Sequence, residues 1–493
     1  MKACPKPVGG PPWNLGGKVR LYEKLAAELE RSIRQGVYLH GERLPSIRQM
    51  RQQQRVAIST VLRAYLLLES RGVVTARPQS GFFVNLRGDH PEPQMLPLVK
   101  TAPAAGAKHV DVSRLVLATL RSIQSDHAIP LGSPYPDPDF FPFGTINRYA
   151  AAAGRTRARW GVTDALPPGN PRLIRQIARR YVEKGVTVDP REIIITVGAT
   201  EAINLGLQAV AQPGDVIAVE SPTFYAMLHA IERLGMKAVE IPTHPDTGID
   251  IDELSSVMES QRIAACMVMP NFQNPLGFLM PDEHKRRLMS LLVKHDIPVI
   301  ENAVYDELYY GRSAPTCLKQ FDEKGLVLHC SSFSKSLTAA YRIGWIMPGR
   351  YRDKVEKLKF LNTLTSPAIP QIAIAGYMER SGFDHHLRRI RKAYAQQANL
   401  MKTMVSRFFP SGTRMSSPAG GYVLWVEMPS GVDAMKVYER ALERGITVGP
   451  GQMFSVSEDT YRSCIRLNYS TPWSAAIEEA VVMVGRIAGA MIR

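Results

Sequence analysis

Apolar runs that alternate with amphipathic stretches constrain the fold of this chain most strongly. From Leu173 onward, short runs rich in Val, Ile, Ala and Met recur between longer stretches of helical periodicity. Strands and helices in alternation predict a mainly parallel sheet with helices on both faces, an α/β fold. The expected strands are 193–196, 216–219, 238–241, 266–269, 299–300, 327–331 and 342–346, and the expected helices include 200–210, 225–234 and 282–295.

The last hundred or so residues differ from this pattern. Residues 421–426 and 464–468 read as antiparallel strands of a smaller α+β lobe that begins at about 385. A chain of 493 residues exceeds what one core supports, so we expect more than one domain. No run approaches the roughly 20 apolar residues of a membrane span. The 5 cysteines are scattered and lack metal-ligand spacing, which favours free thiols in a reducing cytoplasm.

Positive charge is concentrated near the N-terminus. The chain carries 61 Lys and Arg against 45 Asp and Glu, a net charge of +16, and residues 1–86 hold 14 basic and 5 acidic side chains, a net of +9. Such a block suits a polyanion, because neutralising phosphates releases condensed counterions. A solubilising surface would carry the same charge, so the residue pattern has to decide.

The basic block has the pattern of a winged helix-turn-helix. Leu or Ile at every fourth position over 21–33 predicts an amphipathic helix that ends near Gly36. Ser46 is placed to cap a second helix that ends near residue 54, and a third helix is expected over 57–70. Residues 73–84 alternate around a Pro-Gln-Ser-Gly turn, which predicts a β-hairpin. A domain of this kind places one helix in the major groove and the hairpin against the DNA backbone or minor groove.

This segment resembles the DNA-binding domain of the GntR family. The resemblance rests on the motifs Leu-Pro-Ser-x-Arg over 44–48, Ala-Tyr-x-x-Leu-Glu over 64–69 and Arg-Pro-x-Ser-Gly-x-Phe-Val over 77–84. It implies the following candidate contacts to DNA: Ser46, Arg48, Ser59, Thr60, Arg77 and Gly81. Ile58 and Leu62 stand where the family often has arginine, so guanine readout by a bidentate arginine is not expected from this helix. The alternative for Arg48 and Arg77 is a solvated surface charge.

We expect four segments along the chain. They are a disordered leader over 1–17, the DNA-binding domain over 18–86, a linker over 87–125 and a large domain over 126–493. The linker is expected because its residues include four prolines and an Ala/Gly-rich patch, with little periodicity before Val112.

Polar groups gather at the carboxyl ends of the expected strands in the large domain. Lys335 follows an apolar strand on a tight polar turn, where desolvation lowers the pKa of an amine. Ser332 and Arg342 flank this turn and could bracket a phosphate. Ala199 and Thr200 lie at a strand-to-helix turn, where free backbone amides bind anions.

Together these groups resemble the site of fold-type I pyridoxal 5′-phosphate enzymes, the aspartate aminotransferase superfamily. With the winged helix in front, the chain resembles the MocR subfamily of GntR regulators over about 18–490. The resemblance implies pyridoxal 5′-phosphate as cofactor, Lys335 as its Schiff-base lysine and Arg466 as the arginine that grips a substrate α-carboxylate. The other implied cofactor contacts are Ala199, Thr200, Ser332, Ser334 and Arg342 at the phosphate, Phe224 on the pyridine ring, Asn302 at the ring nitrogen, and Asn274 and Tyr305 at the phenolic oxygen. Each of three residues also has a purely structural interpretation: Phe224 as a core residue, Arg466 as a surface cation and Lys335 as an ordinary solvated lysine.

Two departures from this superfamily bear on catalysis. Asn302 stands where these enzymes have an aspartate that keeps the pyridine nitrogen protonated. An amide brings no charge, Glu301 should point to the opposite face of its strand, and Asp306 lies past the strand. We hypothesise that cofactor binding survives and proton abstraction is much slowed. Many relatives also carry a tyrosine upstream of the residue that matches Gly169, which reaches the phosphate of a dimer partner, and none is in register here.

Three functions are compatible with these residues. The first is a regulator that binds a DNA operator as a homodimer and senses an amino compound, or pyridoxal phosphate itself, through the large domain. The second is a working aminotransferase with a fused DNA-binding domain, which Lys335 and Arg466 favour and Asn302 disfavours. The third is a dimerisation domain without cofactor. The first is preferred because a basic winged helix has no role in soluble transamination.

Overall fold

The computed structural model describes residues 20–34, 38, 42–54, 56–77, 81–85, 106–123, 128–156, 165–380, 382–457 and 459–492. The chain divides into two compact units, one that ends at Asp89 and one that begins at His90. Each unit has a hydrophobic core of its own. The expected disordered leader over 1–17 and the tip of the expected hairpin over 78–80 lie outside the described residues.

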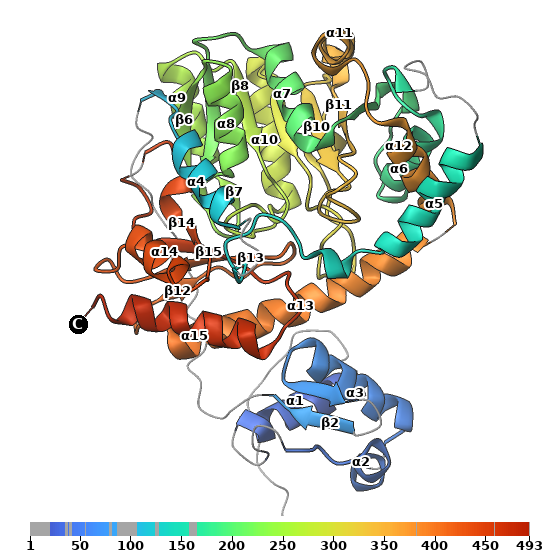
Figure 1. Ribbon diagram of the computed structural model, residues 1–493, viewed down its shortest axis with the longest axis vertical. Helices are drawn as coiled ribbons and strands as arrows, with labels where there is room; N and C mark the ends of the chain where they lie inside the picture. The colour runs from blue at the N-terminus through green and yellow to red at the C-terminus, as the bar shows by residue number, and fades with distance from the viewer. Residues whose placement is uncertain are drawn as a thin grey trace, which may run out of the picture. The chain divides into compact units, whose positions relative to one another are not determined.

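The first unit consists of three helices and a two-stranded hairpin (Figure 1). Its elements are α1 (Leu21–Arg34), α2 (Ile47–Gln54), α3 (Ile58–Ser70), β1 (Val74–Arg77) and β2 (Gly81–Val84). The fourfold spacing of α1 buries Leu25, Leu29 and Ile33 in one core with Val61 and Tyr65 of α3. The expected winged helix-turn-helix is confirmed.

The second unit is built on a large sheet that is mainly parallel. Its strands are β3 (Lys108–His109), β4 (Ile194–Thr196), β5 (Val216–Ser221), β6 (Lys237–His244), β7 (Gly248–Ile249), β8 (Ala265–Val268), β9 (Val299–Asn302), β10 (Val327–Ser332) and β11 (Gly344–Met347). Their order is β3-β6-β5-β8-β9-β10-β11-β4, with β7 beside β6. Strands β6, β5, β8, β9 and β10 run parallel, whereas β11 is antiparallel to both β10 and β4.

Helices lie along this sheet and beyond its β4 edge (Figure 1). They are α4 (Ser113–Ile123), α5 (Phe143–Thr156), α6 (Pro171–Glu183), α7 (Gly198–Val210), α8 (Tyr225–Arg233), α9 (Ile251–Ser260), α10 (Asp282–His295), α11 (Arg352–Thr363) and α12 (Ala368–Glu379). Helix α7 packs on β9, β10 and β11, which fixes its first turn next to the ends of these strands. Among the described residues, no helix is both long and apolar enough to traverse a bilayer.

The smaller lobe follows, and its sheet is antiparallel as expected. Its elements are α13 (Gly382–Phe408), β12 (Arg414–Met415), β13 (Val423–Glu427), α14 (Ala434–Leu442), β14 (Gly449–Pro450), β15 (Cys464–Asn468) and α15 (Ala475–Gly489). The strand order is β12-β13-β15-β14, and Arg466 of β15 pairs with Trp425 on one side and Gly449 on the other. Helices α13 and α15 pack along one side of this lobe (Figure 1).

The predicted linker over 87–125 extends too far toward the C-terminus. Strand β3 pairs with β6, and α4 buries Val116 completely in the core of the second unit. The carboxylate of Glu232 accepts hydrogen bonds from the backbone amides of Val112 and Ser113, each 3.2 Å away, and so caps α4. The interpretation as a tether was wrong here because a two-residue edge strand leaves no periodicity in the sequence.

Candidate cofactor site and DNA interface

Three strand ends of the large sheet meet at one place. Ser332 of β10 lies opposite Gly344 of β11, which in turn lies opposite Thr196 of β4. This register brings together the turns that carry Lys335, Arg342 and the first residues of α7. The predicted phosphate contacts Ser332, Ser334 and Arg342 are joined, because Ser334 accepts a hydrogen bond from Arg342 Nη1 at 3.4 Å and its amide donates to Ser332 Oγ at 3.3 Å.

Two glycines allow close packing at the start of α7. Gly198 has φ +74, and a Cβ there would lie 2.6 Å from Arg342 Nη2. A Cβ on Gly344 would lie 2.6 Å from the Gly198 carbonyl carbon and 2.9 Å from the Ala199 nitrogen. The absence of a Cβ at both positions therefore lets the guanidinium of Arg342 lie against the first turn of α7. Backbone amides at a helix start beside a guanidinium are groups that bind a phosphate.

Lys335 is buried and close to two arginines. Its Nζ donates a hydrogen bond to the Pro134 carbonyl oxygen at 2.7 Å and lies 4.6 Å from the centre of the Tyr135 ring. Burial, followed by the positive charges of Arg466 and Arg342, lowers the pKa of the Lys335 amine from 10.5 to about 7. A large fraction of Lys335 is therefore an uncharged nucleophile near neutral pH.

Arg466 is completely buried and only partly paired. Its Nη2 donates to the Gly132 carbonyl oxygen, whereas Nε and Nη1 have no hydrogen-bond partner. An unpaired guanidinium in a protein interior is costly, and an anionic partner removes that cost. The alternative interpretation of Arg466 as a surface cation is wrong, as is that of Lys335 as a solvated lysine.

A row of polar groups extends from β8 and β9 toward Lys335. Asn274 Nδ2 lies 3.5 Å from the Tyr305 hydroxyl, which donates to the Tyr422 hydroxyl at 3.5 Å, and Tyr422 donates to the Pro134 carbonyl oxygen at 2.9 Å. The Oδ1 atoms of Asn274 and Asn302 are buried without a partner. Orphaned amide oxygens of this kind are rare in protein interiors and indicate that a ligand completes their hydrogen bonds.

Phe224 begins α8 as its N-cap residue and is half-buried. Its ring centre lies 4.5 Å from that of the buried Tyr225. Phe224 thus has an aromatic neighbour in the structure, and its stacking on a cofactor ring stays a prediction.

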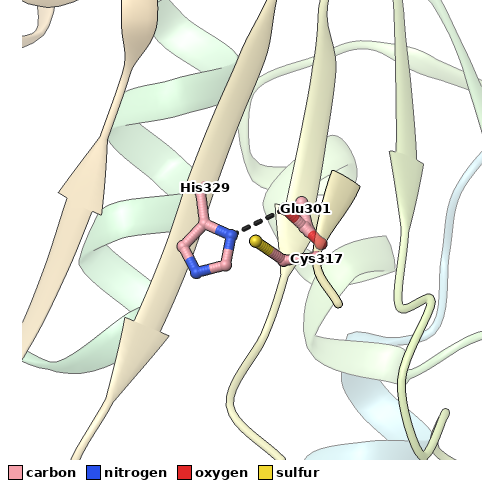
Figure 2. Close-up of side chains that lie close together, drawn as sticks. All are labelled: Glu301, Cys317 and His329. Atoms are coloured by element: carbon pink, nitrogen blue, oxygen red, sulfur yellow. Dashed lines mark hydrogen bonds and ion pairs between the residues drawn. The ribbon is translucent and has the colours of Figure 1, made fainter. Parts of the chain in front are cut away.

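The charge that Asn302 lacks is not supplied by its neighbours. Glu301 lies on the opposite face of β9, where its Oε2 lies 2.6 Å from Nδ1 of His329 on β10 (Figure 2). The other ring nitrogen of His329 lies 2.7 Å from the Tyr181 hydroxyl. Asp306 is engaged elsewhere, because its Oδ1 accepts a hydrogen bond from Asn271 Nδ2 at 3.1 Å, and burial raises the pKa of its carboxyl to about 6.

Figure 2 also shows Cys317 beside Glu301 and His329, and the donor atoms of these three lie within 4.8 Å of one another. Both oxygens of Glu301 have a hydrogen-bond partner, since its Oε1 accepts a hydrogen bond from the Leu318 amide at 2.7 Å. Burial, together with the charge of Glu301, raises the pKa of the Cys317 thiol well above 9 and keeps it protonated. The cluster therefore consists of a hydrogen-bonded Glu301–His329 pair with a protonated thiol beside it.

One segment of the site was missed by the sequence analysis. Residues 131–135 present their carbonyl groups to the site: Gly132 to Arg466, Pro134 to Lys335, and Ser133 and Tyr135 to Nδ2 of Asn468 at 2.8 and 2.9 Å. These residues have no periodicity, and their partners lie more than 200 positions further along the chain. The motif Leu-Gly-Ser-Pro-Tyr-Pro offered only a turn signal.

The predicted DNA contacts occupy α2, α3 and the hairpin. Ser46 caps α2, because its Oγ accepts from the Gln49 amide at 3.3 Å while its own amide donates to the Gln49 side chain at 2.9 Å. Arg48 on α2 and Ser59 at the start of α3 are exposed, and Thr60 is partly buried.

The hairpin carries two of the predicted DNA contacts, Arg77 and Gly81. Arg77 is exposed and its guanidinium lies 4.3 Å from the centre of the Phe83 ring. Gly81 has φ +103, and a Cβ there would lie 3.1 Å from Arg43 Nε, so its role in the structure is conformational.

Both units match known protein families. Residues 141–484 match the aminotransferase class I and II family, and residues 21–84 match the gntR family of bacterial regulatory proteins. The chain is similar to two proteins of Escherichia coli named as uncharacterized HTH-type transcriptional regulators. YdcR is 38% identical over 95% of this chain and 99% of its own, and YjiR is 36% identical over 94% and 98%.

Solved aminotransferases share the fold of the second unit. The multiple substrate aminotransferase of Thermococcus profundus superposes with a TM-score of 0.71 at 26% identity, over 76% of this chain and 95% of its own. LysN, the α-aminoadipate aminotransferase of Thermus thermophilus, superposes with a TM-score of 0.70 at 25% identity over 78% and 99%, as a complex with N-(5′-phosphopyridoxyl)-L-leucine.

The fold and the site thus define a fold-type I, pyridoxal phosphate-dependent scaffold behind a winged helix-turn-helix. The chain belongs to the aminotransferase class I and II family and, through its N-terminal gntR domain, to the GntR-type regulators of the MocR subfamily.

Proposed function

We propose that this protein regulates transcription by binding a DNA operator through its first unit and by sensing an amino acid or related amino compound through pyridoxal phosphate held in its second unit. The observation that carries the proposal is that one site contains both the buried amine of Lys335 and the buried guanidinium of Arg466, two of whose nitrogens have no hydrogen-bond partner. An α-amino acid offers both complements, an amine that competes with Lys335 and a carboxylate that pairs with Arg466.

The residues around this pair fit the cofactor. The first amides of α7, with Ser332 and Arg342, would hold the phosphate, Asn274 and Tyr305 would bond the phenolic oxygen, and Phe224 would cover the ring. When bound, pyridoxal phosphate supplies an aldehyde that captures amines and a ring that withdraws electrons.

Residues 131–135 connect ligand binding to conformation. Lys335 and Arg466 each donate a hydrogen bond to a carbonyl oxygen of this segment. A ligand that takes over both donors removes the Arg466 partner of the Gly132 carbonyl and leaves the Pro134 carbonyl with the Tyr422 hydroxyl alone. The ligand-bound protein therefore favours a different arrangement of the segment, and this difference in affinity between two states is what a sensor requires.

Spectroscopy tests the cofactor. The apoprotein mixed with pyridoxal phosphate should develop the visible absorption of a lysine-bound chromophore that borohydride fixes, and Lys335→Ala should not. A protein that gives no such band has the third function, a dimerisation domain without cofactor, and the proposal then fails.

Titration with single amino acids tests the sensor. An effector should shift the absorption band of the wild type at concentrations at which Arg466→Met shows no shift, because the α-carboxylate then lacks its partner. Arg462→Met, an exposed arginine near the start of the same strand, serves as the control. The same effector should change the affinity for operator DNA, and an effector that leaves DNA binding unchanged contradicts the proposal.

A second candidate, transamination, keeps support from the lowered pKa of Lys335 and from Arg466. Asn302 opposes it, because the carboxylates nearest to it in the sequence are engaged elsewhere, Glu301 with His329 and Asp306 with Asn271. We expect Asn302→Asp to raise the rate of the transamination half-reaction by at least tenfold over the wild type. Equal rates in the two proteins would show that the missing charge is not what limits this site.

We also infer that the protein is a homodimer that binds a paired or repeated DNA site, by analogy with symmetric regulators. Sedimentation of the holoprotein, alone and with operator DNA, measures the stoichiometry. A monomer in both experiments excludes the inference.

A further inference from the structure

We propose that α3 recognises the C5-methyl groups of thymines through Ile58 and Leu62. The operator would then carry thymine at the positions that face these two side chains. This inference rests on the proposed function, since it requires that α3 enters the major groove.

The outer surface of α3 is unusually apolar. Ile58, Leu62 and Leu66 follow one another at a spacing of four residues and are 46, 38 and 41% exposed. The opposite side of α3 buries Val61, Ala64, Tyr65 and Leu68 in the core. The three exposed side chains thus lie along one stripe, and the packing of the described part of the first unit leaves this stripe uncovered.

Charge identifies what covers the stripe. Arg63 is exposed beside Leu62, and Arg48 and Arg51 are exposed on α2, while the first turn of α3 contains no acidic residue. Residues 1–86 carry a net charge of +9. A second copy of this surface would bring like charges together, whereas a DNA duplex offers phosphates to the arginines and, in the major groove, an apolar target.

That apolar target is the thymine methyl group. Each base pair shows a distinct pattern in the major groove, and the C5-methyl of thymine is its apolar feature, which aliphatic side chains contact. Ile58 and Leu62 have no donor for the guanine acceptors that an arginine would read. Their spacing of four residues corresponds to about 6 Å along the helix, roughly two base-pair steps.

Position along the helix separates Leu66 from the other two. The N-terminal residues of a recognition helix contact base edges. Ile58 is the first residue of α3, and Leu66 lies about 12 Å further along the axis. Leu66 has a similar exposure and no assigned base, so Leu66→Ala is a matched control for the loss of exposed apolar surface.

The experiment replaces thymine by deoxyuridine, which removes only the methyl group. Duplexes are first selected from a random pool with the full-length holoprotein, and each thymine of the best site is then replaced in turn. Loss of one buried methyl contact should weaken wild-type binding about fourfold at the positions that Ile58 and Leu62 read. Ile58→Ala and Leu62→Ala should bind the thymine duplex more weakly and should each lose the response to deoxyuridine at one position, whereas Leu66→Ala should keep both responses.

The outcomes separate this inference from the proposed function. If a duplex is selected and bound but deoxyuridine is tolerated at every position, the inference is wrong and the regulator remains. If no duplex is enriched even at low salt, the proposed function itself fails. If Ile58→Ala and Leu62→Ala instead change the sedimentation of the free protein and leave the response to deoxyuridine intact, the stripe is a contact between protein copies and the inference is overturned.

Discussion

Burial determines the chemistry of individual residues in the second unit more than residue type does. Lys335 has a pKa of about 7 because its amine is removed from water next to two arginines. Glu220 on β5 is likewise fully buried, accepts hydrogen bonds from the Met269 amide and Gln273, and has a pKa raised to about 8 by burial. Both groups therefore change charge in a range of pH where an exposed lysine or glutamate would not.

The lowered pKa of Lys335 predicts how the apoprotein takes up its cofactor. Because the folded-state pKa lies below the usual 10.5, the amine is mostly uncharged above about pH 7. The rate constant for capture of pyridoxal phosphate, followed by stopped-flow absorbance, should rise with pH and level off near pH 8. Arg466→Met removes one of the two charges that lower this pKa and should move the midpoint upward, whereas Arg462→Met should leave it in place. A rate that keeps rising toward pH 10 in the wild type would contradict the assignment.

Burial shifts the pKa of Glu220 in the opposite direction and predicts a pH dependence of stability. Its folded-state pKa is raised above the value of 4.5 for the unfolded chain, so its contribution to stability is complete below pH 4.5 and is lost as pH rises through about 8. Between these values the free energy of unfolding falls by up to about 1.4 kcal/mol per pH unit. Glu220→Gln removes this loss. The free energy of unfolding of the variant, measured in urea, should therefore increase relative to that of the wild type from pH 5 to pH 9. An equal difference at both pH values would mean that Glu220 does not titrate in this range.

At the scale of elements, the periodicity of the sequence predicted the regular strands and helices and missed a short edge strand and an extended segment. Apolar runs located the seven expected strands of the large sheet to within about three residues, and helix α10 was predicted with its observed bounds, Asp282–His295. Strand β3 and residues 131–135 were missed, because a two-residue edge strand and an extended segment carry no periodic pattern. The segment is held by side chains such as Asn468, whose proximity depends on the folding of the whole second unit. The polar residues at strand ends could be predicted because they interrupt apolar sequence, and their resemblance to a known family supplied the roles.

The missed segment yields a prediction with a matched control. A Cβ on Gly132 would lie 2.6 to 2.9 Å from backbone atoms of Val448, so Gly132→Ala must displace one of the two backbones. We expect a loss of about 1–3 kcal/mol in the free energy of unfolding and weaker binding of pyridoxal phosphate. Apart from its own helix backbone and chain neighbours, no described residue places an atom within 4 Å of the Cβ position of Gly144 on α5, and Gly144→Ala should stabilise the protein by up to about 1 kcal/mol. Denaturant titrations of both variants measure the difference, and equal stability would show that the segment does not pack tightly against the backbone of Val448.

The capping of α2 provides a second prediction at this scale. Ser46 and Gln49 exchange hydrogen bonds at the start of the helix. Ser46→Ala should lower the stability of the first unit by about 0.5–2 kcal/mol, whereas Ser46→Asp should retain most of it, because aspartate also caps helices. Operator affinity, measured in parallel, distinguishes the cap from a contact to phosphate. If Ser46→Asp keeps stability but loses affinity, Ser46 also contacts DNA, as the sequence predicted.

At the scale of the whole molecule, the two units have separate cores that share no residue. A domain as small as the first unit buries a limited apolar area, and its stability is correspondingly small. The second unit combines a large sheet with a smaller lobe, and residues 131–135 hydrogen bond to both. Two units of such different size should unfold in two transitions, with the first unit melting at the lower temperature.

Ligands should then act on the two transitions separately. Pyridoxal phosphate at 100 times its dissociation constant adds about 2.7 kcal/mol to the unit that binds it, so calorimetry should show a higher second transition, with a smaller shift in Lys335→Ala. Operator DNA should raise the first transition in the same way. A shift of the first transition by an amino acid effector would show that the two units are coupled. Because linkage is reciprocal, the factor by which the effector changes the affinity for DNA must equal the factor by which DNA changes the affinity for the effector. Unequal factors would mean that the effector acts on DNA binding by a route other than the site of Lys335 and Arg466.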